Sequence, residues 1–120
     1  MSLPPRRPIK RTDNASIHRK WLRGFVCICE NDDGNCDLFH PIELAHYRTA
    51  ANSGMGKKPS SIWLVPLCRT HHREQHTIGQ LSFEQKHKFD MGRKAIEFAS
   101  QSPDRAIKDA AKAFHQPSAP

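Results

Sequence analysis

The stretch CRTHHREQH, from Cys68 to His76, holds the residues best suited to chemistry. Residues four apart on an α-helix lie on one face, with side chains about 5–6 Å apart, so His72 and His76 can hold one divalent cation between them. Cys68 and His71 are three apart and lie on a different face of the same helix, where they can hold a second ion. The spacing therefore predicts one helix that serves two metal sites, one open and one structural.

A structural zinc ion takes four nitrogen or sulfur ligands, so two more ligands must come from outside this helix. The candidates are Cys27, Cys29 and Cys36. Cys27 and Cys29 would point the same way in an extended segment but lack the turn of a zinc knuckle, whereas Cys36 can fold back across a flexible loop. The expected zinc ligands are Cys27, Cys36, Cys68 and His71, with Cys29 as the substitute.

Four cysteines in a chain of 120 residues are also compatible with a disulfide framework. The N-terminal sequence MSLPPRRPIKR, however, has no apolar stretch behind its basic residues and does not resemble a secretory signal. In a reducing compartment, cysteines next to histidines are typical of metal ligands. We therefore expect a cytoplasmic protein, and no apolar run approaches the roughly 18 residues of a membrane span.

The charge balance indicates a polyanionic partner. The chain has 19 Lys and Arg and 12 Asp and Glu, which gives a formal net charge of +7. On a small chain this excess favours nucleic acid, although charge that only maintains solubility is the alternative. The candidate phosphate contacts are Arg48, Lys57, Lys58, Arg69 and Arg73.

The hydrophobic pattern predicts a small α+β domain at residues 16–100, between a basic N-terminal arm (1–15) and a C-terminal helix with a frayed tail (101–120). A helix capped by Ser16 should end at Gly24 and precede a short strand over 25–29. Residues 42–47 and 62–67 are expected to pair as a β-hairpin. Helices should follow over 68–77, from Ser82, and from Asp90, with Ser82 and Asp90 acting as N-caps.

Three motifs carry a resemblance to a known family: ELAH (43–46), GMGKKP (54–59) and VPLCRTHHREQH (65–76). Together they resemble the HNH, or ββα-metal, endonuclease superfamily, in particular the small HNH proteins of phages and prophages, over roughly residues 17–100. The resemblance implies a β-hairpin and helix around one catalytic metal, braced by a zinc knuckle. It also implies DNA as substrate, His46 as general base, and Mg²⁺, Mn²⁺ or another divalent cation on His72 and His76.

The sequence departs from the family pattern in two places. Ala45 stands where many HNH proteins have an Asp or His metal ligand, and Trp63 stands near the position of the middle Asn. Glu43 lies on the opposite face of the strand from His46 under strict alternation, so we expect it to assist only if the strand bulges.

The predicted residues fit phosphodiester hydrolysis on physical grounds. An imidazole can take a proton from water near neutral pH, which suits His46, and a divalent cation stabilises charge on the phosphoryl and leaving oxygens. We therefore predict a metal-dependent DNA endonuclease. The alternative is a non-catalytic zinc-braced DNA-binding module, and an RNA-cleaving effector would share the same site chemistry. A partner protein that directs the cut is compatible with the sequence, which does not indicate an oligomeric state.

Overall fold

The centre of the fold is the predicted β-hairpin. The computed structural model describes residues 15–30, 32–49 and 60–114, and within them strands β1 (Glu43–His46) and β2 (Leu64–Leu67) pair in antiparallel fashion. Glu43 lies opposite Leu67 and His46 opposite Leu64, with no bulge between them. Every residue of β2 is buried, which matches its continuous apolar sequence.

Helix α2 (Arg69–Ile78) begins directly after β2. Its N-cap is Cys68, whose sulfur accepts a hydrogen bond from the backbone N–H of His71. Gly79, with φ 90°, ends the helix in a conformation that favours glycine. The Gln75 side chain donates a hydrogen bond of 2.9 Å to the carbonyl oxygen of His46, which ties α2 to the end of β1.

The remaining helices are α1 (Ser16–Leu22), α3 (Gln80–His87), α4 (Met91–Gln101) and α5 (Arg105–Ala111), with short 3₁₀ turns η1 (Ser61–Trp63) and η2 (Lys112–Phe114). The predicted cap at Asp90 is confirmed, because its carboxylate accepts from the backbone N–H of Arg93. Two predicted caps are wrong. Ala15 precedes α1 in the left-handed region while Ser16 is already helical, and Ser82 lies inside α3, which Gly79 opens.

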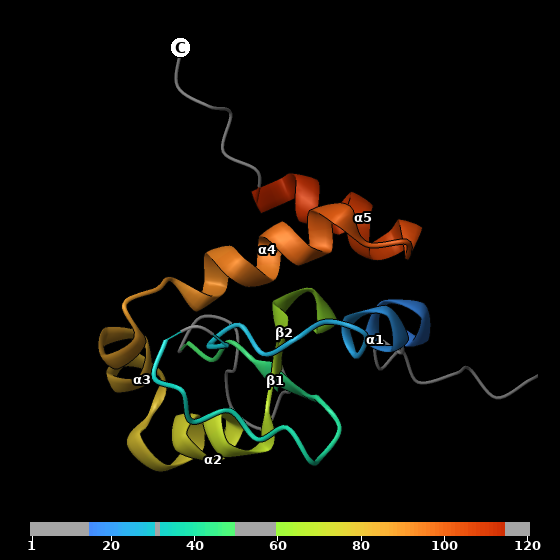
Figure 1. Cartoon of the computed structure of the whole chain (residues 1–120). Coiled ribbons are helices and arrows are strands. Elements are labelled where there is room, and N and C mark those ends of the chain that lie inside the picture. The colour runs from blue at the N-terminus through green and yellow to red at the C-terminus, as the bar shows by residue number, and fades with distance from the viewer. Residues whose placement is uncertain (1–14, 31, 50–59, 115–120) are drawn as a thin grey trace, which may run out of the picture.

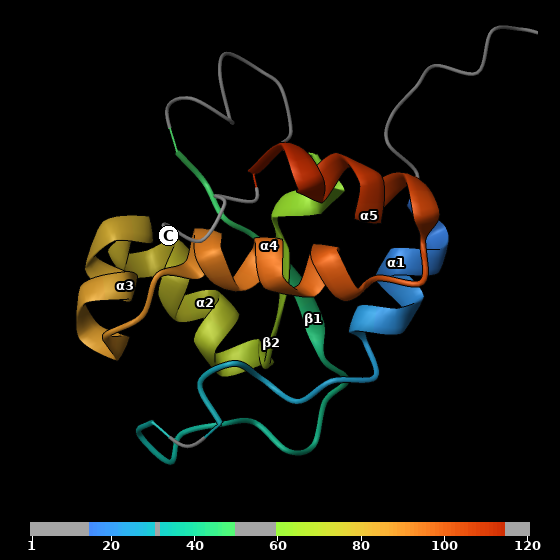
Figure 2. The same ribbon diagram turned by 90° about the horizontal axis from the view of Figure 1, so that it is seen from above.

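The hairpin lies between two helical layers. Figure 1 shows α4 and α5 on one side of the strands and α2 on the other, and the view from above in Figure 2 shows α4 passing over the hairpin. The core between these layers includes Ala45, Val65, Phe83 and Met91. The described chain is therefore an α+β fold with a two-stranded sheet, and none of the described helices is long and apolar enough to cross a membrane.

Residues 25–29 do not form the predicted strand. They follow α1 as a bend and a turn, and one backbone hydrogen bond, from Ile28 N–H to the carbonyl oxygen of Pro66, joins them to β2. The turn continues with bonds from Glu30 N–H to the Cys27 carbonyl and from Asp32 N–H to the Cys29 carbonyl. This turn brings the Cys29 N–H to the sulfur of Cys27, an arrangement that an extended strand does not allow.

Candidate metal-binding and active site

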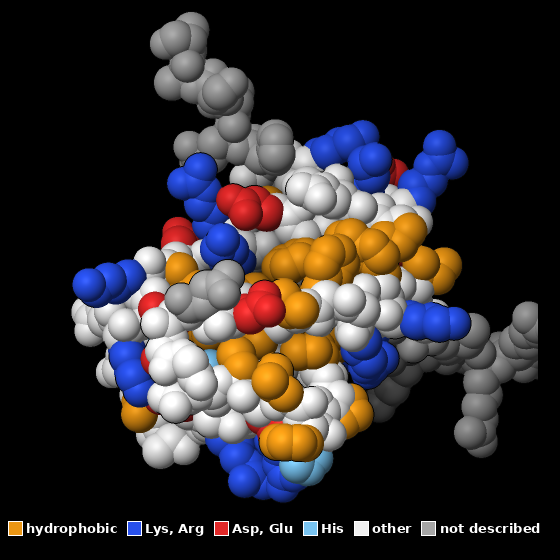
Figure 3. Space-filling model, in the orientation of Figure 1, with side chains coloured by type: hydrophobic (Ala, Val, Ile, Leu, Met, Phe, Trp, Pro, Cys, Tyr) orange, Lys and Arg blue, Asp and Glu red, His pale blue; other side chains and the backbone are white. Residues whose placement is uncertain are grey.

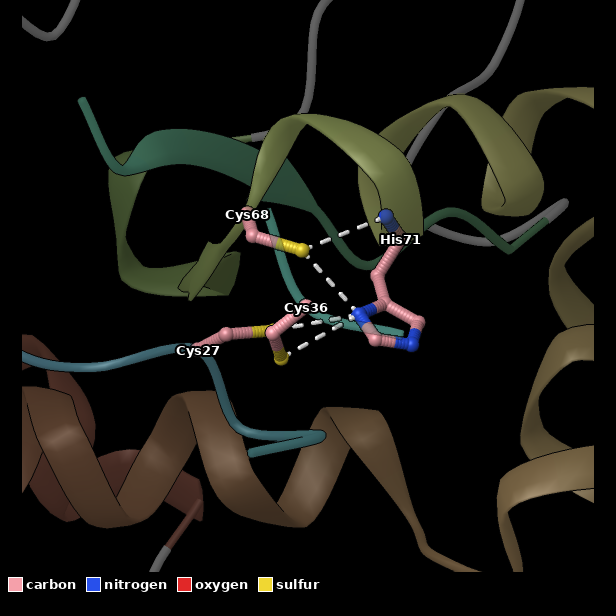
Figure 4. Close-up of side chains that lie close together, drawn as sticks. All are labelled: Cys27, Cys36, Cys68 and His71. Carbon is pink, nitrogen blue, oxygen red and sulfur yellow. Dashed lines mark hydrogen bonds between the residues drawn. The ribbon is translucent and has the colours of Figure 1, made fainter. Parts of the chain in front are cut away.

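Three sulfurs and one imidazole nitrogen converge beside the start of α2. Cys27 and Cys36 come from the turn and loop before β1, while Cys68 and His71 come from the first turn of α2 (Figure 4). The four ligand atoms all lie within 4.8 Å of one another. The structure thus brings together the four residues expected as zinc ligands.

The distances in this cysteine–histidine quartet (Cys27, Cys36, Cys68 and His71) suit a tetrahedral ion. The Nδ1 atom of His71 lies 3.6 Å from the sulfurs of Cys27 and Cys36, and 3.1 Å from that of Cys68. A Zn–S bond of about 2.3 Å and a Zn–N bond of about 2.0–2.1 Å at the tetrahedral angle place S and N about 3.6 Å apart. The quartet could therefore hold a metal ion such as zinc.

Backbone and carboxylate groups support the quartet from outside. The N–H of Cys29 donates to the Cys27 sulfur and the N–H of His71 to the Cys68 sulfur, each at 3.4 Å. The Nε2–H of His71 donates to the Asp33 carboxylate at 2.9 Å. This hydrogen bond places the proton on Nε2 and leaves the Nδ1 lone pair facing the sulfurs, as in carboxylate–histidine–zinc sites.

The electrostatics of the quartet favour a bound cation. A hydrogen bond with the side chain of Cys29 lowers the pKa of Cys27 to about 5 against the effect of burial. Burial and the nearby negative charge of Cys27 raise the pKa of Cys36 to about 12. Three thiols this close do not all ionise near neutral pH by themselves, and a divalent ion supplies the charge that lets thiolates coexist.

Cys29, the substitute ligand, lies beside the quartet rather than in it. Its side chain is buried, and it forms a second group of potential ligands with His71 and His87. Hydrogen bonding with Cys27, together with burial, raises the pKa of Cys29. A neutral buried thiol that contacts the Cys27 sulfur fits the role of a neighbour better than that of a ligand.

We expect Asp33→Ala to weaken zinc binding about 10- to 100-fold, because His71 would lose the carboxylate that orients its ring. Competition with a chromogenic zinc chelator measures this affinity. Asn35→Ala is the matched control, since Asn35 is an exposed neighbour in the same loop. Equal zinc affinities for Asp33→Ala and the parent would show that the carboxylate does not support the ligand.

A second network beside the quartet joins α2, α3 and the loop after Cys29, and the sequence analysis did not identify it. The buried His87 ring contacts the carboxylates of Asp32 and Glu74 through its two nitrogens, and Lys86 pairs with Glu74 at 2.5 Å. Burial opposes a charge on His87, but the hydrogen bonds with Glu74 and Asp32 outweigh it and raise its pKa. Partners 13 and 55 residues away from His87 leave no local spacing signal.

His72 and His76 form a separate group on the exposed side of α2. Their Nε2 atoms lie 3.2 Å apart, and two nitrogens bound to one ion at about 2.0–2.1 Å are about 2.9–3.4 Å apart in octahedral or tetrahedral geometry. The Glu43 carboxylate accepts a hydrogen bond of 2.8 Å from Nδ1 of His72. The pair that the helical spacing predicts is therefore close enough to share one ion.

Glu43 reaches His72 from a regular strand, so the expectation that it needs a bulge was wrong. His46 pairs with Leu64 across the hairpin, and the His46 side chain is half-buried. The carbonyl oxygen of His46 accepts a hydrogen bond from the Gln75 side chain of α2. The role of His46 as general base stays a prediction.

The candidate phosphate contacts divide into two groups. Arg48 follows β1 and is exposed, and Arg69 and Arg73 lie one turn apart on α2. Lys57 and Lys58 lie outside the described residues, as do the GMGKKP motif, nearly all of the N-terminal arm and the last six residues.

Burial lowers the pKa of His76, and the nearby charges of His72 and Arg48 lower it further. The His76 imidazole is thus kept neutral, the form that binds metals.

Comparison with known proteins identifies one relative. Over 88 residues, 72% of this chain, the sequence is 31% identical to the uncharacterized protein YdfU of Escherichia coli (strain K12). The chain spans only 22% of the length of that protein. No protein-family model and no solved structure matches the chain.

Proposed function

We propose that this protein is a metal-dependent endonuclease of the HNH type that hydrolyses phosphodiester bonds in DNA. The observation that carries the proposal is the pairing of His72 with His76, whose Nε2 atoms lie 3.2 Å apart directly beside the quartet. Consecutive residues His71 and His72 belong to the two groups, so α2 joins a structural centre to an open one. A net charge of +7 supports nucleic acid as the substrate.

The residues around His72 prepare the open centre for a divalent cation. Glu43 accepts the Nδ1 proton of His72, which fixes the tautomer and leaves the Nε2 lone pair available. Arg48 helps to keep His76 unprotonated. A cation on these two nitrogens would stabilise negative charge on the phosphoryl and leaving oxygens.

His46 is the proposed general base, which takes the proton of the attacking water. It ends β1, and the hydrogen bond from Gln75 to its carbonyl oxygen positions the end of this strand against α2. Half-buried Arg69 and exposed Arg73 are the candidates to neutralise phosphates of the bound strand. Each of these steps uses a residue of the hairpin or of α2.

A zinc-braced DNA-binding module is the alternative. The quartet and the basic charge serve both functions, but a binding module has no use for two further imidazoles with a carboxylate behind them. Support for catalysis thus comes from Glu43, His72 and His76 together.

We expect the purified protein to convert supercoiled plasmid to nicked and linear DNA with Mg²⁺, Mn²⁺ or Ni²⁺, and not in EDTA. His76→Ala should reduce the rate at low divalent concentration and regain part of it at high concentration, because the loss is one of metal affinity. Thr77→Ala is the matched control, an exposed neighbour on the same helix. Failure of the parent to cut DNA with any divalent ion would favour the binding module.

A further inference from the structure

Two large apolar side chains stand almost fully exposed on the loop between the quartet and β1. Leu38 is 85% exposed and Phe39 is 95% exposed. Single exposed apolar residues are ordinary on protein surfaces, but an adjacent pair on a short turn with nearly all its surface in water is a costly arrangement. We therefore expect a binding partner to cover these two side chains.

The turn that carries this pair is held in place by its own hydrogen bonds. The Asp37 carboxylate accepts from the backbone N–H groups of Phe39 and His40, at 2.7 and 3.1 Å. The His40 ring donates from Nδ1 to Asp37 at 2.7 Å and accepts at Nε2 from the Arg69 guanidinium at 3.0 Å. Leu38 and Phe39 are therefore presented by a turn that is anchored to the first residue of α2.

The anchor sets the distance from the turn to the proposed active site. Arg69 precedes His72 by three residues and His76 by seven, so the three side chains follow one stripe of α2. One turn of an α-helix rises about 5.4 Å. The apolar pair thus lies at the N-terminal end of a stripe whose other end carries the histidine pair.

The turn that carries the pair contacts the Arg69 guanidinium and borders a hollow. At the lower edge of the face in Figure 3, a hydrophobic side chain lies beside a histidine and a group of Lys or Arg side chains. The hollow has a volume of about 210 Å³, and its lining combines the apolar Val26, Leu38 and Ile42 with the acidic Glu30 and Asp37 and the three cysteines of the quartet. Positive charge next to exposed apolar surface matches a nucleic acid strand, which has anionic phosphates and apolar base faces.

We propose that Leu38 and Phe39 contact the bases of a DNA strand whose phosphates follow the Arg69–His72–His76 stripe. This inference deepens the proposed function and rests on DNA as its substrate. The pair stacks on or wedges between bases near the scissile phosphate, so it selects DNA in which bases are already unstacked, such as single strands or junctions. A protein partner would need about 20–30 residues a side and would have to extend over the exposed Phe25 and Val26 as well, and the test below separates it from DNA.

The test is a binding measurement without added Mg²⁺ or Mn²⁺, so that no cutting is needed. Fluorescence anisotropy with a labelled single-stranded oligonucleotide and its duplex, over a range of salt, compares the parent with Phe39→Ala and Leu38→Ala. Phe39→Ala should bind the single strand about 5- to 150-fold more weakly, the range of one lost base stack. The slope of log K against log salt should be unchanged, because no charge is removed. Leu81→Ala, at an exposed leucine of α3, is the control.

The possible results separate this inference from the proposed function. If the parent cuts DNA and Phe39→Ala binds both DNAs like the parent, the base contact is wrong and the nuclease stands. If the parent does not cut but Phe39→Ala loses single-strand affinity, the base contact stands without catalysis. If the parent forms dimers that Phe39→Ala abolishes while DNA affinity is unchanged, a second copy is the true partner and the inference is overturned. A parent that binds no DNA overturns both.

Discussion

Replacing Cys68 with serine is expected to give a chain that neither retains zinc nor folds. Cys68 contributes a sulfur to the quartet, caps α2 and is buried in the main core. Zinc binding in structural sites is worth about 10–16 kcal/mol, whereas whole domains are stable by only about 5–15 kcal/mol. Loss of the ion therefore costs about as much free energy as the whole free energy of unfolding of a typical domain.

Metal analysis after dialysis and far-UV circular dichroism measure the two parts of this expectation. Cys29→Ser is the matched control, because Cys29 is also a buried cysteine next to the quartet but lies outside it. This control should keep one zinc per chain and its helical signal. A folded, zinc-free Cys68→Ser protein would refute the structural role, and a zinc-free Cys29→Ser protein would move the ligand assignment to Cys29.

Replacing His46 with alanine is expected to slow DNA cleavage about 10²- to 10⁴-fold, the usual contribution of a general base. Zinc content, helical signal and DNA affinity should stay close to those of the parent. High divalent concentration should not restore the rate, in contrast to His76→Ala, because the lost function is proton transfer rather than metal binding. Single-turnover cleavage of plasmid DNA at several Mn²⁺ concentrations distinguishes the two variants.

The parent should also lose activity below about pH 6, because protonated imidazoles neither accept a proton nor bind a metal. His76 should contribute least to this loss, since its lowered pKa keeps it neutral to lower pH than an ordinary histidine. The rate therefore falls as His46 and His72 take up protons. Cleavage by His46→Ala at the parental rate, under matched metal and pH, would rule out His46 as the base.

Sequence reasoning located the residues of the quartet because metal ligands leave strong spacing signals. Cys68 and His71 share one helix face, and the loop after Cys29 is long enough to bring Cys36 back to Cys27. The hairpin was equally predictable from the apolar residues at 42–47 and 62–67, and α2 from the helical spacing of its ligand-type residues. These features follow from local periodicity and from the demand for four ligands.

The supporting carboxylates could not be predicted in this way. Asp33 contacts His71 across 38 residues, and Glu43 contacts His72 across 29, so each pairing depends on how the loop and hairpin pack against α2. The false strand at 25–29 has a related cause. Its apolar residues suit a strand, but the turn places the N–H of Cys29 on the sulfur of Cys27 instead.

The direct succession of His71 and His72 on α2 has a consequence for how an active molecule arises. Before Cys27 and Cys36 close around an ion with Cys68 and His71, the start of α2 is held to the loop before β1 by weaker contacts, such as the hydrogen bond between Arg69 and His40. The histidine pair at 72 and 76 is then carried on a helix that is less firmly held at its N-terminal end. If the proposed function is right, a newly made chain would complete its active site only after it has captured the structural ion, so the supply of that ion would set when the nuclease becomes active.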